Sequence, residues 1–125
     1  MWVYFFMLVV HWFADFVCQT RTMANNKSKS LYYLTLHVAV YTIVTITLWV
    51  IFMPIFFDVT FTLNTILLAT GLIFSTHWPT DKITSNITKY FYSKGNEKMF
   101  FTTIGFDQVL HFLQIFWVFE HIILK

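Results

Sequence analysis

Three pairs of histidine and aspartate with one common spacing are the residues of this chain best suited to chemistry. The two members of each pair lie four positions apart in the sequence, and a fourth histidine has a tyrosine at the same spacing. These residues are His11 and Asp15, His77 and Asp81, Asp107 and His111, and His37 with Tyr41. Residues four apart lie on one face of an α-helix, so each pair presents both side chains in one direction. Imidazole and carboxylate groups together are typical ligands of zinc, manganese and iron.

The preferred interpretation of these residues is a site for a divalent transition metal, Zn, Mn or Fe. Its candidate ligands are His11, Asp15, His37, His77, Asp81, Asp107 and His111. With an open coordination position, a bound water becomes a nucleophile near neutral pH and attacks a phosphoryl or acyl centre. Asp15 and Asp107 are the candidate catalytic carboxylates of such a metal-dependent membrane hydrolase, whose substrate would be a lipid or a lipid-linked molecule.

Two other roles for the same residues stay open. In the first, the pairs hydrogen-bond to one another and hold the helices together without a metal. The protein would then be non-enzymatic, either structural or a binder of another membrane protein. In the second, the Asp and His side chains form a pathway for protons or cations across a membrane.

Two glutamines and a proline lie beside the pairs. Gln19 and Gln108 are expected to hydrogen-bond the ligands or to reach the metal through water. Pro79 lies within the His77 and Asp81 pair, and proline lacks an N–H and tends to kink or restart a helix. Asp81 is therefore expected either on the face of His77 or at the mouth of the site.

The composition indicates which elements position these residues. Hydrophobic residues make up 58% of the 125 residues and charged residues only 11%, whereas a soluble domain has about 25% charged residues. Because so few charges cannot cover a soluble surface, the chain is expected to be an integral membrane protein. Four stretches, at about residues 1–20, 31–57, 60–78 and 99–124, are each close to the ~20 apolar residues that span the hydrocarbon core. The expected fold is all-α, a four-helix up-down transmembrane bundle formed by one domain, residues 1–125.

The basic residues set the expected orientation of this bundle. Seven of the eight Lys and Arg residues lie in the first and third loops, which places these loops in the cytoplasm and both termini outside. The His and Asp residues then lie in the cytoplasmic half and face the bundle centre, because lipid does not solvate them. Residues 82–98 are expected to form either a short amphipathic surface helix or a solvated loop, ended by a left-handed Gly95. The lipid bilayer is the expected partner, and nucleic acid is not, because the net charge is only +2.

Five stretches of the chain resemble a known family. They are HWFADFVCQ from His11 to Gln19, MANNK from Met23 to Lys27, the helix of His37, HWPTDK from His77 to Lys82, and DQVLH from Asp107 to His111. In order and spacing they are similar to the small bacterial and phage membrane proteins grouped as the domain of unknown function 3307. The resemblance implies a multi-helix protein of the bacterial inner membrane, or of the host cell membrane if phage-encoded.

The resemblance also implies a set of shared polar residues, without an established activity. They correspond here to His11, Asp15, Gln19, His37, His77, Asp81, Asp107, Gln108 and His111. A looser similarity is to membrane-bound metal-dependent hydrolases, which also place His and Asp pairs on several helices. That second likeness supports the hydrolase interpretation by analogy only.

Overall fold

The helices of this protein follow one another with short connections and no strands. The computed structural model describes all 125 residues. In chain order the elements are α1 (Trp2–Trp12), a π-helical turn η1 (Phe13–Val17), α2 (Arg21–Asn26), α3 (Leu31–Phe57), α4 (Leu63–Ser93), α5 (Glu97–Val118) and a second π-helical turn η2 (Phe119–Ile123). The all-α class is therefore confirmed, with the short α2 as an additional helix.

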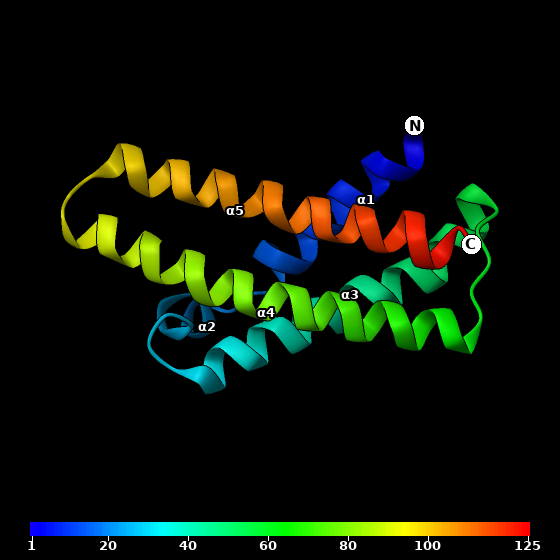
Figure 1. The fold of residues 1–125 in the computed structure, drawn as a ribbon, viewed down its shortest axis with the longest axis horizontal. Helices are drawn as coiled ribbons and strands as arrows, with labels where there is room; N and C mark the ends of the chain where they lie inside the picture. The colour runs from blue at the N-terminus through cyan, green and yellow to red at the C-terminus, as the bar shows by residue number, and fades with distance from the viewer.

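The long helices run antiparallel to their neighbours in sequence, and both chain termini lie at the same end of the molecule (Figure 1). Apolar residues fill the centre of the bundle near the termini. They include Met7, Trp49, Ile73, Ile115 and Phe119. The histidines and aspartates follow on the same inward faces toward α2, so the interior changes from apolar to polar along the bundle. Figure 1 also shows that the hairpin of α4 and α5 extends past the start of α3.

The length of α4 corrects the expected element boundaries. A helix over residues 60–78 and a separate surface segment over residues 82–98 were expected, but α4 runs without a break from Leu63 to Ser93 and has 31 residues. Its start is fixed by a capping box, in which the Thr62 and Thr65 side chains each bond the other's backbone N–H. Pro79 lies inside α4 without ending it. Hydropathy falls after Trp78 because the residues become polar, and polarity alone does not end a helix.

The first helix is also shorter than expected. Its α-helical and π-helical parts together end at Val17, before the expected boundary at residue 20. In the π-helical turn the Cys18 N–H bonds the Phe13 carbonyl, five residues earlier, at 3.0 Å. This wider turn carries Asp15, and such turns are frequent at functional sites.

One helix, α3, is long and apolar enough to cross a membrane, with a mean hydropathy of 2.2 in its most apolar part. The apolar stretch Trp2–Val17 is shorter. α4 and α5 have 31 and 22 residues and are long enough to cross a membrane. They do not meet the criterion because their composition is too polar. Of the four expected spans, this criterion therefore supports one.

The turn between α4 and α5 confirms the expected left-handed glycine, since Gly95 has φ +66°. We predict that Gly95→Ala lowers the free energy of unfolding by about 1 kcal/mol, because a Cβ is disfavoured in this conformation. Thermal unfolding in detergent measures the change. Gly105→Ala in α5 is the control, since its Cβ also meets nothing within 4 Å, and it should be neutral or stabilising by up to about 1 kcal/mol. Equal losses in the two variants would contradict the prediction.

Candidate metal centre

All seven predicted ligands lie in one buried cluster at the centre of the bundle. α1 and η1 supply His11 and Asp15, α3 supplies His37, α4 supplies His77 and Asp81, and α5 supplies Asp107 and His111. Asp107 is the most exposed of them at 8%, and the others are between 0% and 3% exposed. Spacing by four residues on inward helix faces thus brings side chains from distant parts of the sequence together.

His37 lies at the centre of the closest contacts. Its Nε2 atom is 3.1 Å from Asp15 Oδ1 and also 3.1 Å from Asp81 Oδ2. Despite these distances, neither contact has the direction of a hydrogen bond, so His37 Nε2 has no hydrogen-bond partner. His77 Nε2 approaches the same two carboxylates, at 3.7 Å and 3.8 Å, and also lacks a hydrogen bond. Two imidazoles and two carboxylates therefore converge without bonding one another.

His111 adds a third imidazole to this convergence. Its Nε2 atom lies 3.8 Å from Asp81 Oδ1, and its Nδ1 atom lies 3.5 Å from Asp107 Oδ2. Stacking fixes the rings, since the centroid of His77 is 3.9 Å from that of His111 and 4.0 Å from that of Tyr41. His77 and Asp81 remain on one helical face across Pro79, which places Asp81 inside the cluster at 1% exposure and not at its mouth.

Gln108 connects the remaining polar groups of the cluster. Its Nε2 atom donates to Asp15 Oδ2 at 2.9 Å and to Asp107 Oδ2 at 3.2 Å, so its Oε1 atom faces His11 Nε2 at 2.9 Å. Because Oε1 only accepts, His11 Nε2 must donate, and His11 Nδ1 then accepts from the Tyr41 hydroxyl at 2.8 Å. Both nitrogens of His11 are engaged in this arrangement.

We predict that Gln108→Leu lowers the free energy of unfolding by about 1–3 kcal/mol, because it leaves buried polar groups on Asp15 and His11 without a partner. Thermal unfolding in detergent measures the loss. Gln114→Leu is the control, since Gln114 makes a single side-chain hydrogen bond, from its Nε2 atom to Thr80 Oγ1 at 2.7 Å. A loss no larger in Gln108→Leu than in Gln114→Leu would contradict the role of Gln108 as a connector.

Lys27 is a member of the cluster that the sequence did not indicate. It follows α2, and its Nζ atom donates to Asp81 Oδ2 at 3.0 Å. Its side chain is only 18% exposed. Burial lowers the pKa of Lys27, but the Asp81 and Asp15 carboxylates outweigh burial and raise this pKa above its usual value. Lys27 is therefore an ammonium at neutral pH. Periodicity could not identify it, because it lies in the first loop and shares no helical face with the pairs.

Thr84 and Gln19 also depart from the predicted set. The Thr84 hydroxyl, which the sequence did not single out, donates to Asp107 Oδ1. Gln19 was expected on the helical face of Asp15, but the helix ends at Val17, and Gln19 lies in the following loop. Its Oε1 atom is buried and has no hydrogen-bond partner. Gln108, and not Gln19, is the glutamine that hydrogen-bonds the cluster.

The arrangement leaves several good ligand atoms unused. The buried atoms of the cluster without a hydrogen-bond partner are Asp15 Oδ1, His37 Nε2, His77 Nε2, Asp81 Oδ1, and both Nδ1 and Nε2 of His111. Three overlapping groups each offer ligand atoms within 4.8 Å of one another. They are His11 with Asp15 and His111, Asp15 with His37 and His77, and His77 with Asp81 and His111. Buried polar atoms are normally hydrogen-bonded, so this concentration of exceptions calls for an explanation.

Comparison with known proteins identifies the family of the chain. No curated protein and no solved structure matches it. The family described as "Protein of unknown function (DUF3307)" matches residues 3–125. This description carries no activity, so function has to be argued from the cluster itself. Since the match covers almost the whole chain, and confirms the resemblance seen in the sequence, the chain belongs to the DUF3307 family.

Proposed function

We propose that this protein is a multi-pass membrane protein that binds a divalent transition metal in the His and Asp cluster. The observation that carries the proposal is the set of unpaired, buried ligand atoms on Asp15, His37, His77, Asp81 and His111. An unpaired buried polar atom costs about 1–3 kcal/mol. A cation among these atoms would remove that cost, because it accepts the lone pairs of several ligands at once.

The distances in the cluster fit this proposal. Two ligands that each lie about 2.0–2.1 Å from one tetrahedral zinc ion are about 3.3 Å apart. Among the unpaired atoms, Asp15 Oδ1 lies 3.1 Å from His37 Nε2 and 3.7 Å from His77 Nε2, and Asp81 Oδ1 lies 3.8 Å from His111 Nε2. The 3.1 Å contacts of His37 also lie within the range of about 2.7–3.2 Å for an N–H···O hydrogen bond. It is the absence of hydrogen-bond geometry at these atoms, and not their spacing, that supports a shared central ion.

The charges of the cluster favour a dication. Asp15, Asp81 and Asp107 bring three carboxylates into the interior. Lys27 is the one Lys or Arg residue that forms an ion pair with them. With neutral imidazoles, two negative charges remain uncompensated. Buried charges are retained only when they are paired, and a divalent cation supplies the missing charge. Mixed imidazole and carboxylate ligands favour Zn, Mn or Fe over Mg or Ca.

The contacts also divide the predicted residues into ligands and supports. Asp15, His37, His77, Asp81 and His111 have free atoms directed into the cluster and are the proposed ligands. Asp107 would orient His111 through Nδ1, as carboxylates commonly do for metal-bound histidines. Gln108 would hold Asp15 and Asp107, and His11 would support Gln108. His11 would ligate a metal only after releasing Gln108 or Tyr41.

The distribution of side chains supports several membrane spans, although only α3 meets the hydropathy criterion. Thirty large hydrophobic side chains are exposed, whereas eleven of the 26 buried residues are polar or charged. On α4, Leu63, Leu67 and Leu68 are more than half exposed. Averaging along a helix mixes such an apolar outer face with a polar inner face, which lowers the hydropathy of α4 and α5. A polar interior with an apolar exterior suits a bilayer, which the family resemblance would make the bacterial inner membrane, or the host membrane for a phage protein.

Elemental analysis tests the metal proposal. The protein is purified in mild detergent without chelator, and Zn, Mn and Fe are counted by mass spectrometry. We expect about one ion per chain in the purified protein. After the metal is removed with EDTA, the protein should take up about one added Mn²⁺ or Zn²⁺ ion per chain. Uptake below a tenth of this amount would exclude a metal site and favour a metal-free network of His and Asp. Proton or cation flux in liposomes without metal uptake would favour a conduction pathway.

Hydrolysis of a lipid or lipid-linked substrate is the narrower proposal for the same site. Asp107 supports it, because this carboxylate borders the cluster without being a proposed ligand and is the most exposed of the seven residues. Asp107 would accept a proton from an attacking water, while Asp15 would hold the ion. In the metal-loaded protein, Asp107→Asn should abolish release of phosphate or fatty acid from membrane lipids while the metal stays bound. The absence of turnover in the metal-loaded wild type would leave a non-enzymatic membrane protein, structural or partner-binding.

A further inference from the structure

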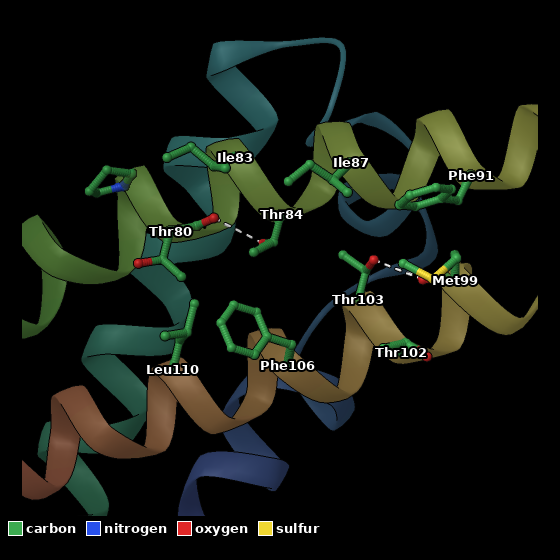
Figure 2. Close-up of a pocket in the computed structure, with 11 residues that line it drawn as sticks. Thr80, Ile83, Thr84, Ile87, Phe91, Met99, Thr102, Thr103, Phe106 and Leu110 are labelled. Atoms are coloured by element: carbon green, nitrogen blue, oxygen red, sulfur yellow. Dashed lines mark hydrogen bonds between the residues drawn. The ribbon is translucent and has the colours of Figure 1, made fainter.

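A groove follows the outer side of α4 and α5 between the cluster and the Gly95 turn. It encloses about 410 Å³, within the usual range of ligand sites. Its apolar wall includes Ile83, Ile87, Phe91, Met99, Phe106 and Leu110. Figure 2 shows Phe106 and Leu110 of α5 directed toward Thr84 and Thr80 of α4. The groove is open to the outside, since Ile83 and Phe106 are 60% and 59% exposed.

We propose that this groove binds one acyl chain of an anionic membrane lipid, with the lipid phosphate at Lys94 and Lys98. The proposal rests on the proposed membrane location and requires the bilayer to reach the Gly95 turn, beyond the cytoplasmic boundary expected near residue 82 from the sequence; it does not depend on the metal. Unlike the bundle interior, the groove offers almost no free polar group. The Thr103 hydroxyl donates to the Met99 carbonyl and the Thr84 hydroxyl donates to Asp107, so neither hydroxyl is free for a ligand in the groove.

The length of the groove suits an acyl chain. From Pro79 to Phe91 the helical rise gives a length of about 18 Å. One leaflet of the hydrocarbon core is about 15 Å thick, which an extended acyl chain spans. One acyl chain can therefore lie along the whole groove.

The charges at one end of the groove favour an anionic headgroup. Lys94 is the C-cap of α4, three residues after Phe91, and Lys98 is the second residue of α5, next to Met99, so both lie where these lining residues end. Both lysines are exposed, and Glu97 is the one acidic residue beside them. A lysine near a membrane surface contributes about 1 kcal/mol to the attraction of anionic lipid. The chain of a lipid whose phosphate lies here would extend toward Pro79 and Leu110.

At its inner end the groove borders the cluster and continues along the helices. Thr84 lines the groove and also donates to Asp107, so a single side chain separates the bound acyl chain from the cluster. A second groove of about 300 Å³, lined by Leu72, Leu113 and Trp117, shares Leu110 with the first. A chain longer than one groove therefore has an apolar continuation along α4 and α5.

Photo-crosslinking with a defined lipid tests this proposal. The full chain is reconstituted in phosphatidylcholine vesicles that contain phosphatidylglycerol with a diazirine at the end of one acyl chain. After irradiation, peptide mass spectrometry should locate the adducts mainly on residues 79–84 and 106–110. Ile87→Trp fills the groove and should lower this labelling at least about fivefold, whereas Ile43→Trp, at an exposed position of α3, should not.

A charge-reversal pair tests the headgroup end. Lys94→Glu with Lys98→Glu should lower labelling about 30-fold or more, because loss of the two lysines alone accounts for about that factor and the glutamates also repel the phosphate, whereas Lys29→Glu with Lys125→Glu should leave it unchanged. Diazirine-labelled phosphatidylcholine should label wild type more weakly than phosphatidylglycerol. Adducts spread evenly over exposed apolar residues, or equal labelling of the two tryptophan variants, would overturn the proposal. Metal content is measured in every variant, so failure of lipid binding with normal metal content leaves the metal proposal intact.

Discussion

Replacing His77 with alanine is expected to abolish metal binding. His77 belongs to two of the three candidate ligand groups, and its ring stacks on both Tyr41 and His111. Loss of an outer partner of a metal ligand typically lowers affinity by about 10–100-fold, so loss of this ligand should exceed 100-fold. Competition between the protein and a fluorescent chelator for Zn²⁺ or Mn²⁺ measures the change.

Two variants make this result specific. His121→Ala removes a histidine that is exposed and bonds the Trp117 carbonyl outside the cluster, so its metal affinity should equal that of wild type. Asp107→Asn should weaken metal binding by only about 10–100-fold, the range for loss of an outer partner of a metal ligand. If His77→Ala and His121→Ala keep the same metal content while both remain folded, the cluster is not a metal site.

Asp81→Asn is expected to lower the free energy of unfolding by about 1–3 kcal/mol even without metal, because Lys27 and His37 lose the carboxylate that they contact. The loss stays below that of an isolated buried ion pair because the Asp15 and Asp107 carboxylates still face Lys27. The Asp81 carboxylate lies 3.0 Å from Lys27 and 3.1 Å from His37 in an environment that is 1% exposed. The lower end of this range is expected, since Lys27 retains 18% exposure and reaches some solvent. Thermal or denaturant unfolding of the metal-free protein in detergent measures the loss.

A double-mutant cycle isolates the contribution of the ion pair. Adding Lys27→Met to Asp81→Asn should recover part of the loss, because the unpaired ammonium is removed with its partner. Lys82→Met serves as the control, since the Lys82 side chain forms no ion pair with Asp81, and it should neither lower stability nor rescue Asp81→Asn. Additive effects of Lys27→Met and Asp81→Asn would show that the 3.0 Å contact contributes nothing to stability.

The convergence of the His and Asp residues could be predicted because it depends on helical periodicity alone. A spacing of four residues defines a face, and an ionisable face turns inward when the outside is apolar. Lys27 and Thr84 escaped prediction for different reasons. Lys27 reaches the cluster from a loop, whose path depends on tertiary packing. Thr84 lies seven residues after His77, near the same face, but threonine alone carries no signal of its partner.

Helix ends were less predictable than helix faces. The polarity of residues 82–93 predicts a loop or a surface segment, yet these residues continue α4. Packing against α5 stabilises this part of the helix whatever its mean hydropathy. The π-helical turn of residues 13–17 has no sequence signature, so the displacement of Gln19 from the face of Asp15 could not be foreseen. Gly95 was predictable, because its role follows from the local backbone conformation.

The position of Lys27 determines the order in which the protein can assemble. Small zinc domains stay unfolded until their metal arrives, because nothing else holds their ligands together. Here the chain carries its own monovalent cation into the carboxylates, through the contact between Lys27 and Asp81. In the proposed membrane protein, insertion and folding can therefore precede any encounter with metal. Loading would then add a dication beside the tethered ammonium, which stays on Asp81 and keeps the charges of the interior in balance.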